Sequence, residues 1–401
     1  MEIRHLNYTI LYAFIFFMTV VPSMTIAKKE PALSQTVTLN DLWQGQAHFK
    51  EVAKLNWSDS SGSHHEQAGS FAVHGGVWYV FNRATLDRST QNCRRDHARM
   101  VARSSTDHGR TWSSPIAIVD PGRSVRGDEC AVLDGSVYYD DASSTWHLLA
   151  QCLDRDRDGT PALWALCHYT RKALSPLGRF EGDLANPVVE GGSLWSKICA
   201  GEHKACPVTT RDEGTPEILS STRGRFLVTM HGYDPVSKQG FRGVVSTRDF
   251  RTWKVRGQGL SNDAMLSSKD CLAWLPHCAG VGQASTISYP GDPHRYMIIE
   301  AVTKSLACTA GQDWEFHLIR LPSSVWPRSG ANKWIKFPGK AFLTTAYPAP
   351  SSLCPVQYAR WIQDGNNTYL VYEDWDRKHG TVDRRLLKLV PGKAKIPVSN
   401  K

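Results

Sequence analysis

The sequence predicts an all-β protein assembled from repeated sets of short antiparallel strands. β-rich segments alternate with turns along most of the chain, and 31 Gly and 21 Pro residues supply those turns. Aromatic residues, which favour strands, are abundant, with 14 Trp, 13 Tyr and 13 Phe. No stretch keeps the 3.6-residue apolar periodicity of an amphipathic helix, which counts against an α/β barrel.

The composition excludes several classes of protein. Of 401 residues, 41% are hydrophobic and 21% charged, which is enough for a sizeable core and excludes general disorder. The mean hydropathy of -0.36 excludes a protein with several membrane spans. The 47 basic and 38 acidic residues give a net charge of +9, which favours acidic partners or serves only solubility. Because no dense Lys/Arg run occurs outside the C-terminal tail, nucleic acid is not expected as a partner.

The N-terminus predicts export. Arg4 and His5 precede an apolar run over 10–21, and the small residues Thr25 and Ala27 follow it. This pattern predicts a signal peptide over 1–27 and a secreted or periplasmic protein. The alternative is an uncleaved anchor, for which the run is short against the ~20 residues of a spanning helix. We therefore expect no membrane span after cleavage.

All ten cysteines follow this segment, which predicts up to five disulfides in an oxidising compartment. Three pairs are close in sequence: Cys152/Cys167, Cys199/Cys206 and Cys271/Cys278. The pairing of the other four stays open: Cys93, Cys130, Cys308 and Cys354. No CxxC spacing occurs, so a zinc site is not expected.

A loose internal repeat organises the chain. Five times, a β-rich segment, a turn and a second β-rich segment follow one another, and each set predicts a hairpin: 69–81, 134–150, 216–229, 284–299 and 358–372. A third strand is expected after each hairpin, at 99–105, 162–170, 240–247, 314–321 and 384–390. A fourth, outer strand follows the first four, for example at 114–119 and 254–256.

Four short strands at this period predict a five-bladed β-propeller of four-stranded antiparallel blades. The fifth repeat lacks its outer strand, and we expect the N-terminal strand 48–56 to supply it and close the ring. The expected organisation is a signal peptide (1–27), an N-terminal segment (28–47), a single propeller domain (48–392) and a basic tail (393–401). A two-sheet sandwich is the alternative, but it does not explain five recurrences in one order.

One turn matches a known motif. Residues 105–112 read Ser-Thr-Asp-His-Gly-Arg-Thr-Trp, the S-x-D-x-G-x-T-W pattern of an Asp box, and 246–253 are a degenerate copy. The Asp107 carboxylate is expected to accept backbone N–H bonds in a tight turn, with Trp112 packed between strands. The motif resembles the sialidase-type Asp box, which in that family lies away from the active site. Asp107 is therefore expected to be structural.

Three segments resemble glycoside hydrolase family 43 and its five-bladed relatives. Residues 133–140 (LDGSVYYD) are similar to a D-P-S-V-x-x-D strand, with Gly135 where Pro is usual. Residues 213–218 (EGTPEI) are similar to an E-G-P segment with one insertion, and 280–285 (GVGQAS) to a G-P-G-H-x-S segment. The resemblance implies that the first strand of each blade lines a central funnel and that catalytic carboxylates come from three blades.

Glycoside hydrolysis needs one carboxylic acid that protonates the leaving oxygen and a second carboxylate that activates water or attacks the sugar. We predict that Glu213 is the acid, that Asp134 orients it and raises its pKa, and that Glu66 activates water. All three precede or begin the first strand of a blade. Glu217, also on the third blade, is the alternative to Glu213 as the catalytic carboxyl group. Surface carboxylates are common, so each of these four could instead be a solvated or ion-paired residue.

The resemblance to family 43 implies an Asp as general base at the position where this chain has Ala68. His64 or His65 could therefore serve as the base. For substrate binding we select His65, Arg360 and Trp375. A sialidase-like carboxylate clamp could be formed by Arg94, Arg95, Arg103, Arg242 and Arg360. However, the F-R-I-P segment of sialidases does not occur near the mature N-terminus.

The sequence thus predicts a secreted, monomeric glycoside hydrolase that acts on a carbohydrate, which could be acidic. The alternatives are a sialidase-like exo-glycosidase and a non-catalytic carbohydrate-binding propeller. No cofactor is required by this chemistry, no metal-binding residues are selected, and a structural calcium ion in the channel is compatible with the pattern.

Overall fold

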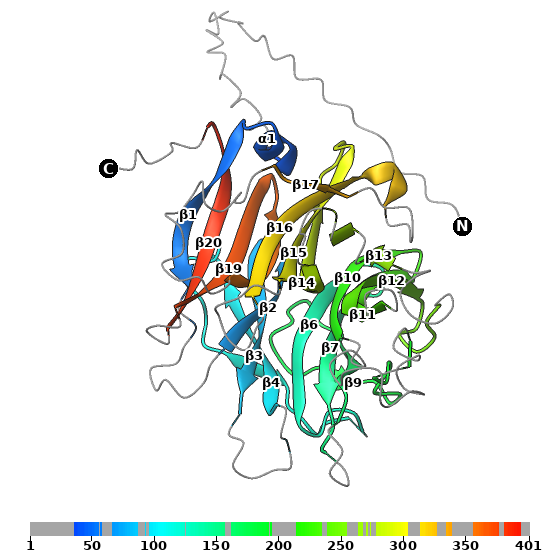
Figure 1. Cartoon of the computed structure of the whole chain (residues 1–401). Coiled ribbons are helices and arrows are strands. Elements are labelled where there is room, and N and C mark those ends of the chain that lie inside the picture. Colours follow the sequence, from blue (N-terminus) through cyan, green and yellow to red (C-terminus); the bar gives the residue numbers. More distant parts are fainter. Residues whose placement is uncertain are drawn as a thin grey trace, which may run out of the picture. The chain divides into compact units, whose positions relative to one another are not determined.

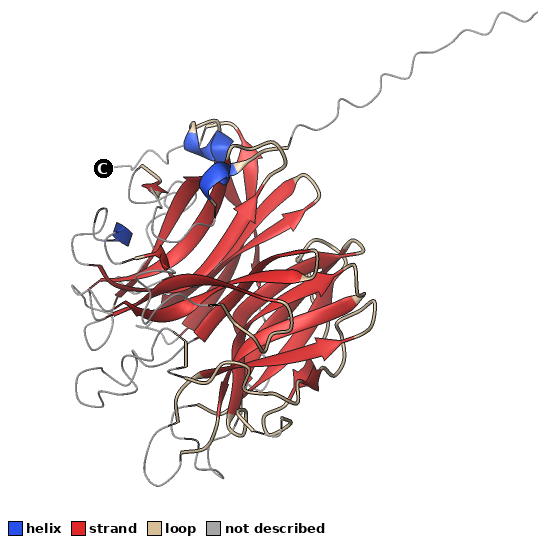
Figure 2. Cartoon of the chain, turned by 90° about the vertical axis from the view of Figure 1, so that its right-hand side faces the viewer, coloured by secondary structure: helices blue, strands red, loops and turns tan. Residues whose placement is uncertain are grey.

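The computed structural model describes one all-β unit, which begins at Thr36. It describes residues 36–55, 57, 66–86, 93, 96–124, 126–156, 162–191, 193–194, 214–234, 239–254, 264–267, 270–271, 273, 278–303, 313–326, 334–338, 356–376 and 381–393. Strands account for nearly all the regular structure within these residues (Figure 2).

The strands form antiparallel four-stranded sets, numbered one to five here in chain order of their first strands (Figure 1). Set one contains β2 (Glu66–His74), β3 (Val77–Thr85), β4 (Ala98–Ser105) and β5 (Ile116–Val119). Set two contains β6 (Ala131–Asp140), β7 (Thr145–Leu153), β8 (Ala165–Arg171) and β9 (Glu181–Gly182). Set three contains β10 (Gly214–Thr222), β11 (Arg225–Asp234), β12 (Gln239–Thr247) and β13 (Ala264–Leu266). Set four contains β14 (Cys278–Ser288), β15 (His294–Thr303), β16 (Asp313–Pro322) and β17 (Ile335–Lys336). Set five contains β18 (Val356–Asp364), β19 (Asn367–Asp376), β20 (Thr381–Pro391) and β1 (Ala47–Leu55).

The five predicted hairpins and five third strands are confirmed by these pairings. The outer strand of set three is β13. Of the predicted outer strand 254–256, only Lys254 is among the described residues, and it makes an isolated antiparallel bridge to Ser246 of β12. Sets one and two also share one parallel residue pair, Ala98 with Ala131.

The predicted pairing of the N-terminal strand is confirmed. β1 runs antiparallel to β20, from Ala47 opposite Pro391 to Leu55 opposite Arg384, and the two lie side by side in Figure 1. The short helix α1 (Leu39–Trp43) precedes β1. It begins with a capping box in which the Thr38 and Asp41 side chains bond each other's backbone N–H. Leu39 and Leu42 are buried against the apolar residues of sets four and five.

The apolar core lies in seams between consecutive sets. One cluster joins sets one and two, a second sets two to four, a third sets four and five, and a fourth sets five and one. Aromatic side chains fill these seams, as expected for most of them. Trp78 of β3 and Tyr369 of β19 meet edge to face, for instance, with ring centroids 4.8 Å apart.

Hydrogen bonds also connect the first strands of consecutive sets. In four cases a side-chain oxygen of one first strand accepts a backbone N–H of the next. These bonds run from Val137 to Ser70 (3.1 Å), Ile218 to Ser136 (2.9 Å), Thr286 to Glu217 (2.7 Å) and Trp361 to Ser285 (3.1 Å). In the fifth case the Arg360 side chain of β18 donates to the backbone oxygen of Gly69 in β2 at 2.6 Å. The bonds therefore return to the set where they began.

The turn over residues 105–112 has the local hydrogen bonds expected for Asp107. The Asp107 carboxylate accepts the N–H groups of Arg110 and Thr111, which lowers the pKa of Asp107 to about 2. The residue after this aspartate, His108, has a positive φ of 58° and contacts Asp364 of set five at 2.6 Å. The turn thus fastens set one to its neighbour.

The degenerate copy forms the same turn in set three. Asp249 accepts the N–H groups of Arg251 and Thr252. Phe250 has φ 55° and stacks on His168 of set two. Each turn therefore contacts another set: the first turn contacts set five and the second contacts set two.

Three disulfides are present in the described residues. Cys152–Cys167 and Cys271–Cys278 confirm the predicted pairs, and Cys93–Cys130 resolves one pairing that the sequence left open. The remaining cysteines lie outside the described residues: Cys199, Cys206, Cys308 and Cys354. Over the same described ranges, no helix has the length and apolar character needed to cross a membrane.

Candidate functional site

Every first strand has a register irregularity near its beginning. It falls between Gln67/Ser70, Leu133/Ser136, Gly214/Glu217, Val281/Ala284 and Gln357/Arg360. Three residues in these irregularities have positive φ although they are not glycine: Asp134 (47°), Thr215 (42°) and Tyr358 (58°). Such backbone costs about 1–3 kcal/mol per residue and concentrates at functional sites. Bulges also re-aim side chains, so this end of the first strands is the place to look for a site.

Arg83 is the centre of a charged cluster at this end. Its Nη1 lies 3.4 Å from Asp134 Oδ2 of β6 and 4.0 Å from Asp96 Oδ2 in the loop before β4. Its Nη2 donates to the Tyr358 hydroxyl of β18 at 2.9 Å, and the guanidinium lies over the Tyr358 ring. Groups from sets one, two and five therefore meet at one cation.

Burial shifts the protonation equilibria of this cluster. Burial raises the pKa of Asp134, while Arg83 and Arg360 act in the opposite direction. Asp134 Oδ1 is buried and has no hydrogen-bond partner among the described residues. Burial alone would lower the pKa of Arg83, but Tyr358, Asp134 and Asp96 outweigh it and raise that pKa. Arg83 is therefore a permanent cation beside a carboxyl group whose pKa is raised above its ordinary value.

Glu300 of β15 is a second carboxyl with a shifted pKa, and the sequence reasoning missed it. Its two oxygens accept the backbone N–H groups of Tyr358 (2.5 Å) and Gln283 (3.3 Å). Burial raises the pKa of Glu300 to about 7. By bonding both N–H groups, Glu300 supports the irregular backbone of sets four and five. The available signal was a lone acid in the apolar second strand Tyr-Met-Ile-Ile-Glu-Ala.

Glu373 of β19 gives the same signal, as an acid after an apolar run. It is fully buried and accepts a hydrogen bond from Arg384 of β20 at 2.8 Å. Its charge also contributes to raising the pKa of Arg83, so it belongs to the surroundings of the Arg83 cluster.

Arg360, which was selected for substrate binding, points into the protein. It donates to the carbonyl oxygens of Gly69 and Ala284, and burial lowers its pKa. Arg242 behaves similarly: it donates to Thr215, and burial lowers its pKa to about 10. These two arginines therefore bind first strands together, and they do not form a carboxylate clamp at the surface.

Glu66, the predicted base, is 4% exposed. Both of its carboxylate oxygens are bonded to Arg103, one through Nε at 3.0 Å and the other through Nη2, and Asn82 donates to it at 2.9 Å. A base must reach water or substrate, and this carboxylate is already occupied inside set one. The geometry is that of a buried ion pair which connects β2, β3 and β4.

Glu217 takes part in the connections between first strands. Its Oε1 accepts both the N–H and the hydroxyl of Thr286, and burial raises its pKa. It lines a small cavity of about 130 Å³ together with residues of all the first strands, among them Ser70, Ser136, Thr286 and Arg360. This position is central, but Glu217 is bonded to a neighbouring strand.

Three selected residues are described only in part or not at all. Glu213 and His65, and with them His64, lie outside the described residues. Trp375 lies in β19 opposite Val382. Gly214 begins β10 so close to Gln151 that a Cβ on it would lie 2.7 Å from the Gln151 side chain. Since Gln151 is opposite Leu133, the residue after Glu213 is beside the strand that carries Asp134.

Within the described residues, no group of three or more His, Cys, Asp or Glu side chains is arranged to hold a metal ion. The Arg83 cluster itself offers carboxyl, phenol and guanidinium groups, which can transfer protons and stabilise charge.

Comparisons with known proteins identify the fold. No family model and no curated protein matches the chain. Solved structures do match: a glycoside hydrolase has a TM-score of 0.58 at 10% identity, covering 88% of this chain and 95% of that chain. A thermostable family-43 glycoside hydrolase has a TM-score of 0.52 at 12% identity, covering 83% and 96%. A family 117 glycoside hydrolase from the marine bacterium Zobellia galactanivorans has a TM-score of 0.51 at 10% identity, covering 86% and 90%. The resemblance to these hydrolases is thus confirmed for the fold.

Proposed function

We propose that the chain is an exported glycoside hydrolase on a five-bladed propeller, with its site at the Arg83 cluster. The sets one to five are then the blades, and β1 is the outer strand of blade five. Two observations support closure: the hydrogen bonds between first strands return to β2, and the seams include one between sets five and one. The shared fold with glycoside hydrolases supports the reaction class.

The observation that carries the proposal is the position of two carboxyl groups on one cation. Asp134 from blade two and Asp96 from blade one lie 3.4 Å and 4.0 Å from the same Arg83 nitrogen. Asp134 differs from an ordinary surface ion-pair residue in three respects. Its partner Arg83 also contacts Asp96, its φ is positive, and its Oδ1 is buried without a hydrogen-bond partner among the described residues. Converging acids from separate blades are what hydrolysis of a glycosidic bond requires.

In this proposal Glu213 remains the general acid. It protonates the glycosidic oxygen while the bond from that oxygen to the anomeric carbon breaks. In this proposal the charge of Asp134 disfavours the ionisation of Glu213, which keeps the proton of Glu213 available near neutrality. Arg83 balances the negative charge that Asp134 would otherwise bring into a buried place.

The base is proposed to be Asp96 and not Glu66. Asp96 comes from the same blade, and its side chain is 19% exposed, whereas Glu66 is sealed in its pair with Arg103. A carboxylate with solvent access can accept the proton of the attacking water as the new C–O bond forms. Thus a residue in the loop before β4 takes the role that the resemblance assigns to the position of Ala68.

A second candidate is a non-catalytic carbohydrate-binding propeller. It is favoured by one observation, the closed Glu66–Arg103 pair, which leaves the usual first-blade position without an acid. The two candidates differ in whether a bound glycan is cleaved.

The experiment is to incubate the protein with plant, bacterial and animal polysaccharides and to measure reducing ends, with affinity electrophoresis on the same panel. Release of reducing ends by wild type, lost in Asp134→Asn, supports the hydrolase. Retardation without release supports the binding protein. Neither release nor retardation on any polysaccharide overturns both.

The remaining features of the proposal follow from the sequence. Cleavage after Ala27 would release a monomer that works outside the cytoplasm without a cofactor, and the disulfides fit an oxidising compartment. A structural calcium ion in the channel remains a prediction.

A further inference from the structure

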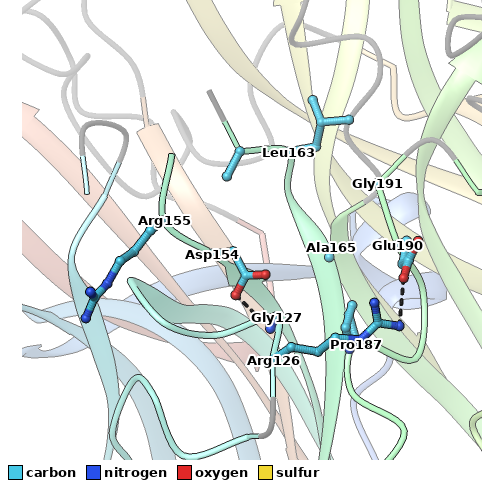
Figure 3. A pocket seen from close by; sticks show the side chains of 10 residues that line it. Arg126, Gly127, Asp154, Arg155, Leu163, Ala165, Pro187, Glu190 and Gly191 are labelled. Carbon is cyan, nitrogen blue, oxygen red and sulfur yellow. Dashed lines mark hydrogen bonds and ion pairs between the residues drawn. The ribbon is translucent and has the colours of Figure 1, made fainter. Parts of the chain in front are cut away.

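We propose that a cavity at one end of blade two is a second sugar-binding subsite, which holds a neutral sugar unit of the same glycan chain outside the funnel. This inference rests on the proposed function. The cavity has a volume of about 340 Å³, within the range of sites that bind small ligands (Figure 3). The residues that form it come from four segments of blade two: 126–127, 154–155, 162–165 and 187–191.

The cavity lies at the end of blade two that carries Asp134. Arg126 and Gly127 precede β6, and Asp154 follows β7, whose last residue Leu153 is opposite Ala131 at the start of β6. Asp134 is three residues further along β6, roughly 10 Å at the rise of a strand. A glycan chain that enters the funnel at this end would therefore pass over blade two.

The chemistry of the lining fits a hydroxylated ring. Leu163, Ala165 and Pro187 provide an apolar surface on which the C–H face of a sugar can pack. At the rim, Arg126 Nη2 and Glu190 Oε1 form an ion pair of 2.9 Å with side chains 61% and 56% exposed. Such exposed pairs contribute little to stability, so both groups are available to exchange one partner for a sugar hydroxyl.

The charges argue for a neutral sugar. Arg126 and Arg155 are balanced around the cavity by Asp154 and Glu190. A carboxylate or sulfate in the cavity would be surrounded by two acids as well as two arginines. A hydroxyl, by contrast, can donate to the acids and accept from the arginines.

The rim is held in place before any ligand arrives. Gly127 N donates to Asp154 Oδ1 at 2.7 Å, a bond drawn in Figure 3. A Cβ on Gly127 would lie 2.9 Å from the Pro187 ring and 3.2 Å from the sulfur of Cys167, so only glycine fits. The next residue, Asp128, is fully buried and accepts the hydroxyl of Tyr169 at 2.8 Å. A rigid rim reduces the entropy lost on binding.

The subsite predicts that substrate chain length controls efficiency. A short substrate occupies the funnel alone, whereas a longer chain also occupies the cavity and gains affinity. The variant is Arg126→Ala. The matched control is Arg179→Ala, an exposed arginine of the same blade that pairs with Glu181 and does not line the cavity.

The test measures kcat/KM on xylo-, arabino- and gluco-oligosaccharides of two to six units, and on oligogalacturonides as acidic probes. For the neutral series that is cleaved, Arg126→Ala should lower the ratio of long-chain to short-chain kcat/KM about tenfold relative to Arg179→Ala, the size of one lost charge-assisted hydrogen bond. An equal ratio in the two variants overturns the subsite and leaves the hydrolase standing. A larger effect on the acidic probes overturns its assignment to neutral sugars.

If no probe is cleaved, the proposed function is decided by the polysaccharide panel above, and the subsite is judged by calorimetric titration of the six-unit chains. Binding to Arg179→Ala that is about tenfold weaker in Arg126→Ala still supports it. Equal binding in the two variants, or binding to neither, overturns it.

Discussion

Arg360 of β18 donates its Nε–H to the carbonyl oxygen of Gly69 in β2 at 2.6 Å. This bond joins two residues that are 291 positions apart in the chain. The same guanidinium donates to the carbonyl oxygen of Ala284 in β14 at 3.1 Å, so a cation connects β18 to both of the first strands beside it. The seam between the first and last sets therefore depends on a buried arginine and on β1.

The first prediction concerns β1. Removal of residues 28–56 should unfold the protein at a markedly lower temperature, because β20 would lose its partner and Phe49 would leave the core of sets four and five. Thermal unfolding followed by circular dichroism measures this. The control is removal of residues 394–401. An unchanged melting temperature without 28–56 would show that β1 is not part of the closure.

The second prediction concerns Asp134. Asp134→Asn removes the charge that is proposed to raise the pKa of the general acid Glu213, so activity should fall about 10²-fold or more. In the pH profile of kcat/KM, the basic limb, which reports loss of the proton from Glu213, should move to lower pH. Asp141→Asn, in the exposed turn of the same hairpin, is the control. A wild-type pH profile in Asp134→Asn would remove Asp134 from the mechanism.

The third prediction separates Glu213 from Glu217. Glu213→Gln retains shape but cannot donate the proton, so activity should fall ~10²–10⁴-fold with the fold intact. Glu217→Gln keeps an oxygen that can accept from Thr286 and should retain turnover near wild type. Initial rates on the cleaved glycan decide between them. If Glu217→Gln abolishes turnover and Glu213→Gln does not, the acid is Glu217 and the assignment made here is wrong.

The fourth prediction is a pH dependence of stability at the seam of sets two and three. His147 and His168 stack there, with Nδ1 of the first 3.0 Å from Nε2 of the second. Burial, and then the charge of His168, lowers the pKa of His147 from 6.5 to about 4. The unfolded chain therefore binds more protons than the folded chain between about pH 4 and 6.5. The free energy of unfolding should decrease as pH falls through this window, by on the order of 1–3 kcal/mol.

Urea titrations at pH 7.5 and pH 5 would measure this loss. His147→Gln removes the titrating imidazole and should reduce the pH dependence, whereas His48→Gln, at a half-buried position in β1, should not. If wild type and His147→Gln lose the same free energy of unfolding between pH 7.5 and pH 5, the histidine pair does not titrate in this range.

The fifth prediction concerns the disulfides. The ten cysteines of the exported chain should form five bridges, so that the intact mass is lower than the reduced mass by ten hydrogens. Peptide mapping should recover the three bridges seen here. Replacing Cys152 and Cys167 by Ser should destabilise the protein by about 2–4 kcal/mol. Two or more free thiols in the native protein would contradict the prediction.

The hairpins were predictable because their signals are local. Turns such as Gly75–Gly76 lie between two alternating segments, and period-two alternation describes a strand that is buried on one face. The outer strand of set three was not predictable in this way. β13 has only three residues, Ala264–Leu266, and forms two residue pairs with β12. So short a pairing leaves little pattern in the sequence.

Among the described residues, the proposed site contains one that the sequence selected, Asp134, and others that it did not. Asp134 could be selected because the segment around it resembles a known strand motif. The occupation of Glu66 could not be foreseen, because its partner Arg103 is 37 residues away and spacing does not show which acid an arginine meets. Arg83 was missed for the same reason, because its partner Tyr358 belongs to another set. Glu300 left a local signal, a lone acid in an apolar strand, but that signal does not show its contact with Tyr358.

The pairing of Ala47 with Pro391 places the start of the first strand next to the end of the last strand, and Gly392 N donates to Gln46 O at 2.7 Å. A domain whose ends meet can be accommodated inside another chain, since its host needs to span only a strand-to-strand distance of about 5 Å. In the proposed ring, the order of the sets does not depend on where the chain starts. Joining residues 46 and 392 by a short linker and opening the turn at Gly75–Gly76 would move the chain ends from set five to set one. The Arg83 cluster should still assemble in this permuted protein.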